Sequence, residues 1–117
     1  MKILSNINST YRSPALATGN TVHKWSIAVT CKFKFNHKEM NKLGGFNFDI
    51  ITKPLTYNIY DGGGELELIN SEIIDSLPEH EIDQKIDYLR KELKAKVNEV
   101  KEHLIKEFDF EVEEVEA

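Results

Sequence analysis

The sequence predicts an α+β fold in which an antiparallel sheet of four to five strands packs against one long C-terminal helix. Three observations predict it. Apolar and polar residues alternate over residues 23–36, a glycine-rich turn at 61–64 separates two further alternating segments, and an apolar stripe at helical spacing follows Pro78. Successive side chains of a strand point to opposite faces, whereas one face of a helix recurs about every 3.6 residues. The chain therefore combines a sheet with a helix that can cover one of its faces.

Length and composition indicate one globular domain over residues 1–117. Hydrophobic residues make up 40% and charged residues 30% of the chain, which argues against wholesale disorder. No apolar run reaches the ~20 residues that span a membrane, and the first residues turn polar too soon for a secretory signal. The lone Cys31 excludes an internal disulfide and fits a reducing compartment. We therefore expect a cytoplasmic protein that does not bind membranes.

The N-terminal part is predicted to contain a loop, a long strand and one helical turn. Residues 8–20 are rich in turn formers and lack periodicity, which predicts a polar loop. In residues 23–36 one parity is apolar and the other carries mainly lysine, serine and threonine, which predicts a strand with one buried face. Cys31 has the apolar parity, so we expect a buried thiol and not a nucleophile. Residues 37–45 are predicted to form a turn or one helical turn, which two glycines stop.

The middle of the chain is predicted to add strands and a hairpin. Phenylalanine and isoleucine alternate with polar residues over residues 46–50, which predicts a second strand. Residues 55–60 and 65–69 alternate on either side of the glycine-rich turn, which predicts a β-hairpin. The Asn-Ser-Glu segment that follows is expected to cap a short helix over residues 70–77.

A long helix is predicted from Pro78 to residue 107. Proline suits the first helical position, where its missing N–H has no intrahelical partner. The apolar stripe of this helix consists of Ile82, Ile86, Leu89, Leu93, Val97, Val100 and Leu104. Its period of ~3.67 residues exceeds the ~3.5 of a left-handed coiled coil, so we expect the helix to lie on the sheet. Residues 108–117 are predicted to form a short strand and an acidic tail.

The expected length of this helix suggests self-association. At ~1.5 Å per residue it would measure ~45 Å, which is longer than a small sheet can cover. We expect part of the apolar stripe to extend past the sheet edge and to be covered by a second subunit. The sequence therefore predicts a homo-oligomer with the helix at its interface.

Charge is distributed unevenly along the chain. Residues 1–58 carry eight basic and two acidic side chains, whereas residues 59–117 carry seven basic and eighteen acidic ones. Such a split fits halves that face each other, a basic half that meets an anion, or simply two solvated faces. Direct nucleic-acid binding is disfavoured by a pI of 5.4, by the presence of only two arginines, and by strand aromatics that lie on the opposite parity from the lysines.

Recognisable catalytic and cofactor motifs are missing from the sequence. No phosphate-binding loop, dinucleotide fingerprint, zinc-finger spacing or calcium loop occurs, and a hairpin turn accounts for the glycines at 61–64. The histidines are His23, His37, His80 and His103. No two of them are four residues apart, so no helix face would present a pair of metal ligands. We therefore predict no cofactor and no structural metal.

The best candidate for a ligand site is the segment around Tyr11, Arg12 and Ser13. An arginine binds phosphate or carboxylate bidentately, and a tyrosine ring can stack on a base. Thr18, Asn20 and His23 could complete such a pocket, with or without a neighbouring subunit. An ordinary surface loop is the alternative interpretation of the same residues.

No family is identified from the sequence. The order of long strand, hairpin and helix loosely resembles the tunnelling fold of pterin-synthesising enzymes. That resemblance implies several closely placed zinc-binding histidines, but this chain offers only Val22-His23-Lys24 at the comparable place. No activity is therefore carried over.

The leading hypothesis is a non-catalytic binding protein that acts as a homo-oligomer and engages a protein partner as an inhibitor or adaptor. The composition is rich in Lys, Ile, Asn and Glu and poor in Arg, which is typical of AT-rich genomes and favours a phage or mobile-element origin. In one version, the acidic helix and tail (residues 107–116) mimic nucleic acid and occupy a basic groove of the partner. Strong salt dependence would distinguish that version.

Two alternatives stay open. In the first, the Tyr11 and Arg12 segment sequesters a small anionic, nucleotide-like ligand, which a thermal-shift screen would reveal. In the second, the protein is a small enzyme in which His23 acts as a general base on a neighbouring hydroxyl group. Unchanged turnover in His23→Ala would reject that enzyme.

Overall fold

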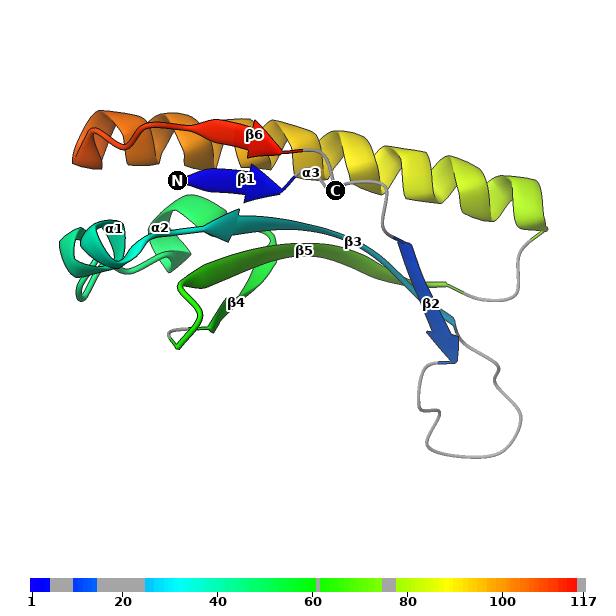
Figure 1. The fold of residues 1–117 in the computed structure, drawn as a ribbon. Coiled ribbons are helices and arrows are strands. Elements are labelled where there is room, and N and C mark those ends of the chain that lie inside the picture. Colours follow the sequence, from blue (N-terminus) through cyan, green and yellow to red (C-terminus); the bar gives the residue numbers. More distant parts are fainter. Residues whose placement is uncertain (5–9, 15–24, 61, 75–77, 116–117) are drawn as a thin grey trace.

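The computed structural model describes residues 1–4, 10–14, 25–60, 62–74 and 78–115, with the backbone alone for residues 10–14 and Trp25. In chain order its elements are β1 (Lys2–Leu4), β2 (Thr10–Pro14), β3 (Trp25–Lys34), α1 (His37–Lys42), α2 (Asp49–Thr52), β4 (Thr56–Tyr60), β5 (Glu65–Ile74), α3 (Glu79–Phe108) and β6 (Glu113–Val115). Figure 1 shows α3 running along the sheet, with β6 and β1 beside it.

The strands form one sheet in the order β4-β5-β3-β1-β6, and β2 pairs with the same edge of β3 as β1. All pairs are antiparallel except β1 with β6, which run parallel. The described strands thus number six, one more than the upper end of the predicted range. The predicted fold class, an α+β fold with a mostly antiparallel sheet on one long C-terminal helix, is confirmed.

The centre of the sheet is the long pair of β3 and β5. Their register joins ten residues of each strand, from Trp25 opposite Ile74 to Lys34 opposite Glu65. The apolar parity of β3 is buried as the sequence predicts. The fully buried side chains of this pair are Ile27, Val29, Cys31, Phe33, Leu66 and Leu68. Together they form the surface on which α3 packs.

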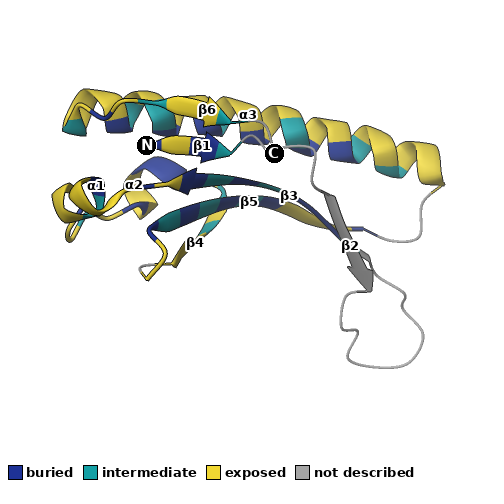
Figure 2. Cartoon of the chain, viewed as in Figure 1, coloured by how far each residue is buried: buried dark blue, intermediate teal, exposed yellow. Residues whose placement is uncertain are grey.

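Helix α3 follows the prediction to within a residue or two. Pro78 is its N-cap, and Asp109 ends it in the left-handed conformation with its N–H donating to the Ile105 carbonyl at 2.9 Å. The buried side chains of α3 are Ile86, Leu89, Leu93, Val97, Val100 and Leu104. Figure 2 shows this buried face turned toward the sheet along the helix.

The burial of that stripe corrects one expectation. Six of the seven predicted stripe residues are buried within the single chain, and Ile82 is half-buried. The sheet is long enough because β3 and β5 each extend over ten residues. The predicted overhang is therefore wrong, and the stripe of α3 gives no reason for a second subunit. The homo-oligomer itself stays a prediction.

Residues 46–50 do not form the predicted strand, because Asp49 begins the short helix α2. The Asn47 side chain accepts a hydrogen bond from the Asp49 N–H at 3.0 Å, which starts the turn. Phe46 packs edge-on against Phe48 at 5.0 Å and against Phe108 at 5.3 Å between ring centroids. These ring contacts, one of them with Phe108 of α3, override the local alternation.

The predicted short helix over residues 70–77 is also wrong in its described part. Strand β5 continues to Ile74, and residues 75–77 lie outside the described residues. The local Asn-Ser-Glu signal favours a helix cap, but every residue from Asn70 to Ile74 has a partner on β3. The ladder with β3 determines the structure here.

Three smaller differences concern the chain ends and the predicted loop. Within the predicted loop 8–20, Thr10–Pro14 form β2, because the edge of β3 beyond β1 offers a partner. Lys2–Leu4 form β1, which the sequence does not predict. The last strand, β6, is Glu113–Val115, later than the predicted start at 108, because Phe110 is buried in the core before it. None of the described helices has the length and apolar character needed to cross a bilayer.

Candidate functional site

Half of the predicted ligand site falls on the described backbone. Tyr11, Arg12 and Ser13 lie on β2, opposite Ala28, Ile27 and Ser26 of β3. They belong to a strand and not to a loop, which corrects the prediction for these three residues. Thr18, Asn20 and His23 lie outside the described residues. The grouping of all six residues, and the general base His23, stay predictions.

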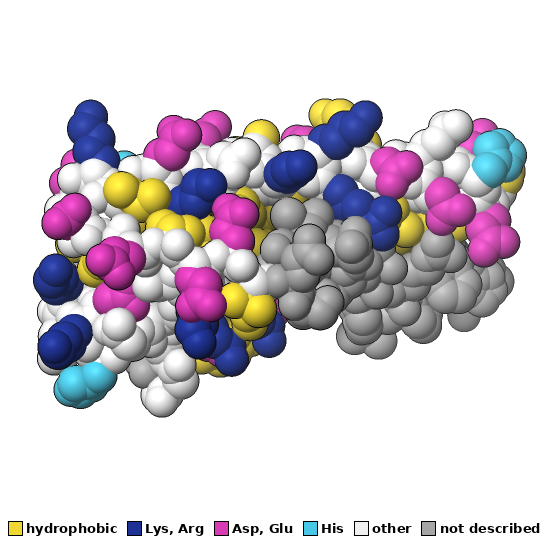
Figure 3. All heavy atoms as spheres, turned by 45° about the horizontal axis from the view of Figure 1, so that its top comes forward, with side chains coloured by type: hydrophobic (Ala, Val, Ile, Leu, Met, Phe, Trp, Pro, Cys, Tyr) yellow, Lys and Arg dark blue, Asp and Glu magenta, His cyan; other side chains and the backbone are white. Residues whose placement is uncertain are grey.

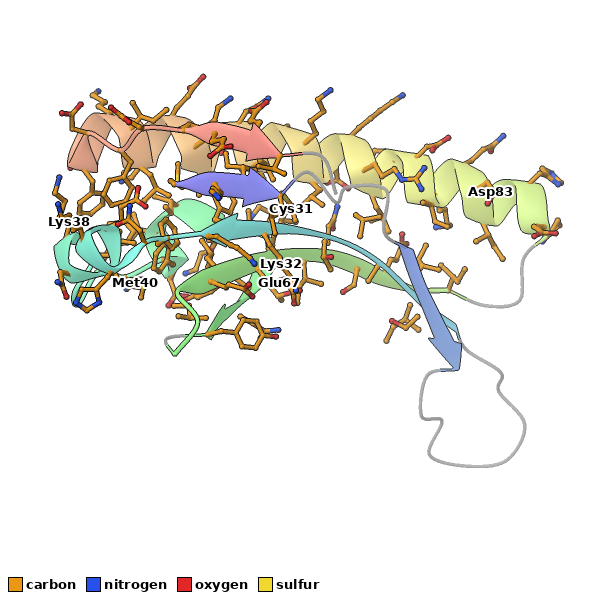
Figure 4. The ribbon with its side chains drawn as sticks, in the orientation of Figure 1. Cys31, Lys32, Lys38, Met40, Glu67 and Asp83 are labelled. Atoms are coloured by element: carbon orange, nitrogen blue, oxygen red, sulfur yellow. The ribbon has the colours of Figure 1, made fainter. Side chains whose placement is uncertain are left out.

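The sheet face that turns away from α3 is charged at one end. Lys32 Nζ lies 3.9 Å from Glu67 Oε2, and Lys34 Nζ lies 3.3 Å from Glu65 Oε1, both across the β3–β5 pair. Figure 4 shows Lys32 and Glu67 near one another on these strands. The lysine-bearing face is therefore as predicted, and the carboxylates offset the charge of these lysines.

The other end of this face carries no charge in its described part. Ile73 lies opposite Ser26, and Ser71 lies opposite Ala28. The Ile73 side chain is 62% exposed, and Ser71 beside it is also exposed. The paired lysines and glutamates thus give way to small side chains and one exposed isoleucine along the same two strands.

The outer face of α3 carries both signs of charge. The helix contains eight acidic and seven basic side chains, and Figure 3 shows the two signs interspersed along it. Several of these charges are paired at short distance, including Lys96 with Glu99 at 2.7 Å and Arg90 with Asp87 at 3.1 Å. The mixed charge of α3 does not resemble the uniform negative charge of a nucleic-acid backbone, whereas the mimicry expected of residues 107–116 stays a prediction.

The only cysteine is chemically quiet. Cys31 is fully buried, and its Sγ donates to the Leu4 carbonyl at 3.4 Å. Burial, with a smaller effect from the charge of Glu114, raises the pKa of the Cys31 thiol to about 12. The thiolate is the nucleophilic form, so this side chain is suited to packing and not to covalent chemistry. The predicted buried thiol is confirmed.

A buried ion pair lies where α1 begins. The Met1 ammonium donates to Glu39 Oε2 at 2.7 Å and to the Glu111 carbonyl at 2.8 Å. Glu39 Oε1 accepts the Asn36 N–H at 2.9 Å, and Asn36 Oδ1 accepts the Glu39 N–H at 2.8 Å, which is a capping box. The sequence signal for the capping box is Asn36 three residues before Glu39, but nothing local indicates the contact with Met1.

A cavity of about 430 Å³ lies beside this ion pair. Lys2, Lys34 and Glu113 contribute charges of both signs to its lining. Lys34 is paired with Glu65, and the Met1 ammonium is paired with Glu39. The cavity therefore does not present a set of charges of one sign that would select an anion or a cation.

Four of the five residues of the edge strand β4 are exposed. Ile59 and Tyr60 are 41% and 47% exposed, and Ile50 of the neighbouring helix α2 is 73% exposed. Ile59 also borders a small apolar hollow of about 130 Å³, together with Met40 and Phe46. Half of the six large apolar side chains that are exposed in the described chain thus lie between residues 50 and 60.

The hydrogen bonds of the hairpin determine which way its backbone groups point. The Phe35 N–H donates to the Gly64 carbonyl at 2.8 Å, so the backbone groups of Gly64 point toward β3. These groups alternate in direction along an antiparallel strand. Those of Glu65 consequently point toward β4, where Tyr60 is the partner.

Continuing this alternation identifies the outward groups at the edge. On β4, the N–H and C=O groups of Tyr57 and Ile59 point away from β5. On β5, which continues past the end of β4, those of Ser71 and Ile73 point outward as well. Within the described part of the chain, no strand pairs with either segment on that side. On this side of the sheet, the described strands therefore leave two short stretches of unpaired edge.

The described residues contain no group of three or more His, Cys, Asp or Glu side chains that could hold a metal ion. Comparison with known proteins adds no relative, since no family model, no curated protein and no solved structure matches this chain.

Proposed function

We propose that this chain is a non-catalytic binding protein that works as a homo-oligomer and engages a protein partner as an inhibitor or adaptor. The observation that supports it best is the unpaired edge of the sheet beside exposed apolar side chains. Edge strands accept a further strand through their backbone groups, while side chains next to the edge provide selectivity.

The stretch that we assign to the partner is the free end of β5. The backbone groups of Ser71 and Ile73 point outward there, and the Ile73 side chain is 62% exposed. A strand of the partner would pair with this end of β5 and cover Ile73. The described part of the neighbouring face is uncharged, so an apolar or neutral segment would fit better than a charged one.

Partner capture with matched variants tests this proposal. The immobilised protein is incubated with an extract of cells that carry its gene, in parallel with Ile73→Pro and with Ile105→Ser. Proline removes one outward N–H and the apolar side chain, whereas Ile105 is an exposed residue on α3. We expect a specific protein to be retained by the parent chain and by Ile105→Ser but lost with Ile73→Pro. Equal retention by both variants, or no specific retention, would contradict the proposal.

A second function, sequestration of a small anionic, nucleotide-like ligand, has one observation in its favour. The sequence places Tyr11 and Arg12 next to one another, and an arginine binds phosphate bidentately while a tyrosine ring can stack on a base. A screen by thermal shift against nucleotides and cyclic nucleotides tests it, because a ligand at about 100 times its Kd adds ~2.7 kcal/mol of stability. Arg12→Ala should abolish the shift, and Arg90→Ala, which removes the other arginine, should not. No shift with any anion would reject this function.

We further propose a cytoplasmic location and a phage or mobile-element origin. The location is supported by the lone, buried Cys31, which fits a reducing compartment. The origin is supported by composition alone.

A further inference from the structure

Within the described part of the chain, strand β4 has none of the charges, prolines or further strands on its outer side by which edge strands avoid association. Its sequence, Thr-Tyr-Asn-Ile-Tyr, contains no charge and no proline, and four of its five residues are exposed. Natural edge strands are usually protected by lysines, prolines, bulges or a covering element. The open edge of β4, with Ile59 and Tyr60 exposed beside it, is therefore a surface on which another strand would be stable.

The sequence of β4 is complementary to itself in one antiparallel register. With Asn58 on the two-fold axis, Tyr57 lies opposite Ile59 of the second copy, and Thr56 lies opposite Tyr60. Pairs of an aromatic residue with a β-branched residue are favourable neighbours across strands. The two Asn58 side chains would meet at the centre, where each amide can both donate and accept a hydrogen bond. No charged residue of either strand would be brought against a like charge.

The backbone directions fit the same register. The outward groups of β4 belong to Tyr57 and Ile59, and this register places Tyr57 of each copy opposite Ile59 of the other. Each such pair exchanges two hydrogen bonds, so the joined strands satisfy all four outward groups of each copy. If the register is shifted by two residues, only one of the two outward residues of each β4 lies opposite a residue of the other copy's β4. The second outward residue then lies beyond the end of that strand.

We infer that a second copy of this chain pairs with β4 through this register and joins the two sheets edge to edge. The inference deepens the proposed function, because it rests on the homo-oligomer and names its interface. It leaves the free end of β5, with Ser71 and Ile73, for the protein partner. The contact has two-fold symmetry, which is the commonest symmetry of soluble homo-oligomers.

A pair of proline variants separates the two edges. Ile59→Pro removes an outward N–H of β4, and Ile73→Pro removes an outward N–H of β5, so neither variant breaks a hydrogen bond of the described ladder. The oligomeric state of the full chain is measured by sedimentation over a range of concentrations, with circular dichroism as the control for folding. We expect Ile59→Pro to weaken the dimer by about a hundredfold or more in Kd and Ile73→Pro to change it by less than about threefold.

Charge exchange at Asn58 tests the register itself. Asn58→Asp and Asn58→Lys each place like charges opposite one another only if the axis passes through this residue. We expect each variant alone to have a Kd raised by about tenfold and an equimolar mixture of the two to regain a dimer near the parent Kd. This test does not depend on the Ile59→Pro variant, so it can be carried out even if that variant does not fold.

The possible outcomes distinguish this inference from the proposed function. A parent chain that is monomeric at every concentration would overturn both the inference and the homo-oligomer. An oligomer that Ile73→Pro disrupts and Ile59→Pro does not would overturn the inference while the homo-oligomer stands. Failure of the Asn58 mixture to form a dimer would reject the register. The interface would be supported if Ile59→Pro loses the dimer and if the equimolar mixture of the two Asn58 variants regains it.

Discussion

The side-chain amide of Asn70 donates a hydrogen bond of 2.9 Å to the backbone carbonyl of Leu89. Asn70 is one of three buried polar or charged side chains among the described residues, and it lies on the face of β5 that packs against α3. The bond ties the middle of the longest helix to the centre of the sheet. Buried polar groups that are satisfied in this way fix how two elements align.

We expect Asn70→Ala to lower the free energy of unfolding by about 1 kcal/mol, since one buried hydrogen bond is lost. Asn70→Asp should be worse at neutral pH, because a carboxylate can only accept and would face the Leu89 carbonyl. Its protonated form can donate, so the Asp variant should regain stability as the pH is lowered toward ~4. Urea denaturation at several pH values measures this, with the exposed Ser71→Ala as control. An Asp variant as stable as the Ala variant at neutral pH would contradict the argument.

Glu39 supports two contacts with its two oxygens, one to the Asn36 N–H and one to the Met1 ammonium. Glu39→Ala removes the capping box and leaves the buried ammonium without its carboxylate. We expect a loss of about 3 kcal/mol in the free energy of unfolding. Thermal and urea unfolding measure it, and Glu107→Ala, which truncates an exposed carboxylate on α3, should stay within about 0.5 kcal/mol of the parent. If Glu39→Ala and Glu107→Ala lower the free energy of unfolding by similar amounts, the buried contact of Glu39 with Met1 does not contribute more than an exposed carboxylate.

The sequence predicts the elements whose burial pattern repeats along the chain. Strand β3, the β4–β5 hairpin and α3 each present one apolar face at the period of their own structure, so local alternation is sufficient. The strand predicted for residues 46–50 is wrong because there the local alternation is not sufficient. Phe46 and Phe48 alternate like a strand, but their rings pack against one another, and the ring of Phe46 also packs against Phe108, which is distant in the chain.

The ends of β5 and of the sheet depend equally on distant partners. The segment from Asn70 to Ile74 resembles a helix start locally and becomes strand because β3 pairs with it. The parallel pair of β1 with β6 joins the two ends of the chain, which no local pattern can indicate. The open edge at β4 has the same origin. The sequence predicts the strand, but only the sheet order shows that its outer side has no neighbour among the described strands.

The burial of Cys31 predicts both its reactivity and an effect of pH on stability. A thiol-specific reagent should react with the native protein only as fast as the chain opens, and fully once urea unfolds it. The folded pKa of about 12 lies above the unfolded value of 9.0. The folded state therefore retains its proton where the unfolded state loses it, so this stabilisation is complete below pH 9 and is lost as the pH rises toward 12. Comparing the pH dependence of unfolding in the parent and in Cys31→Ala isolates this effect. A rapid reaction of the native protein would contradict the burial.

Gly64 ends the hairpin turn at a position that only glycine fits. Its φ of +63° is left-handed, and a Cβ there would lie 2.7 Å from the Phe35 carbonyl oxygen. That contact is with backbone, so β3 and β5 would have to separate locally and weaken the bond from the Phe35 N–H to the Gly64 carbonyl. The left-handed conformation adds ~1 kcal/mol for a residue with a side chain.

We therefore expect Gly64→Ala to lower the free energy of unfolding by about 2–4 kcal/mol. Gly62 of the same turn is the matched control, because a Cβ added to it would meet nothing within 4 Å. Gly62→Ala should consequently lie within about 0.5 kcal/mol of the parent. Urea denaturation of both variants measures the difference. Equal stability of the two would mean that the turn rearranges freely, and then the register of β4 against β5, on which the assignment of the outward edge groups depends, would not be fixed by Gly64.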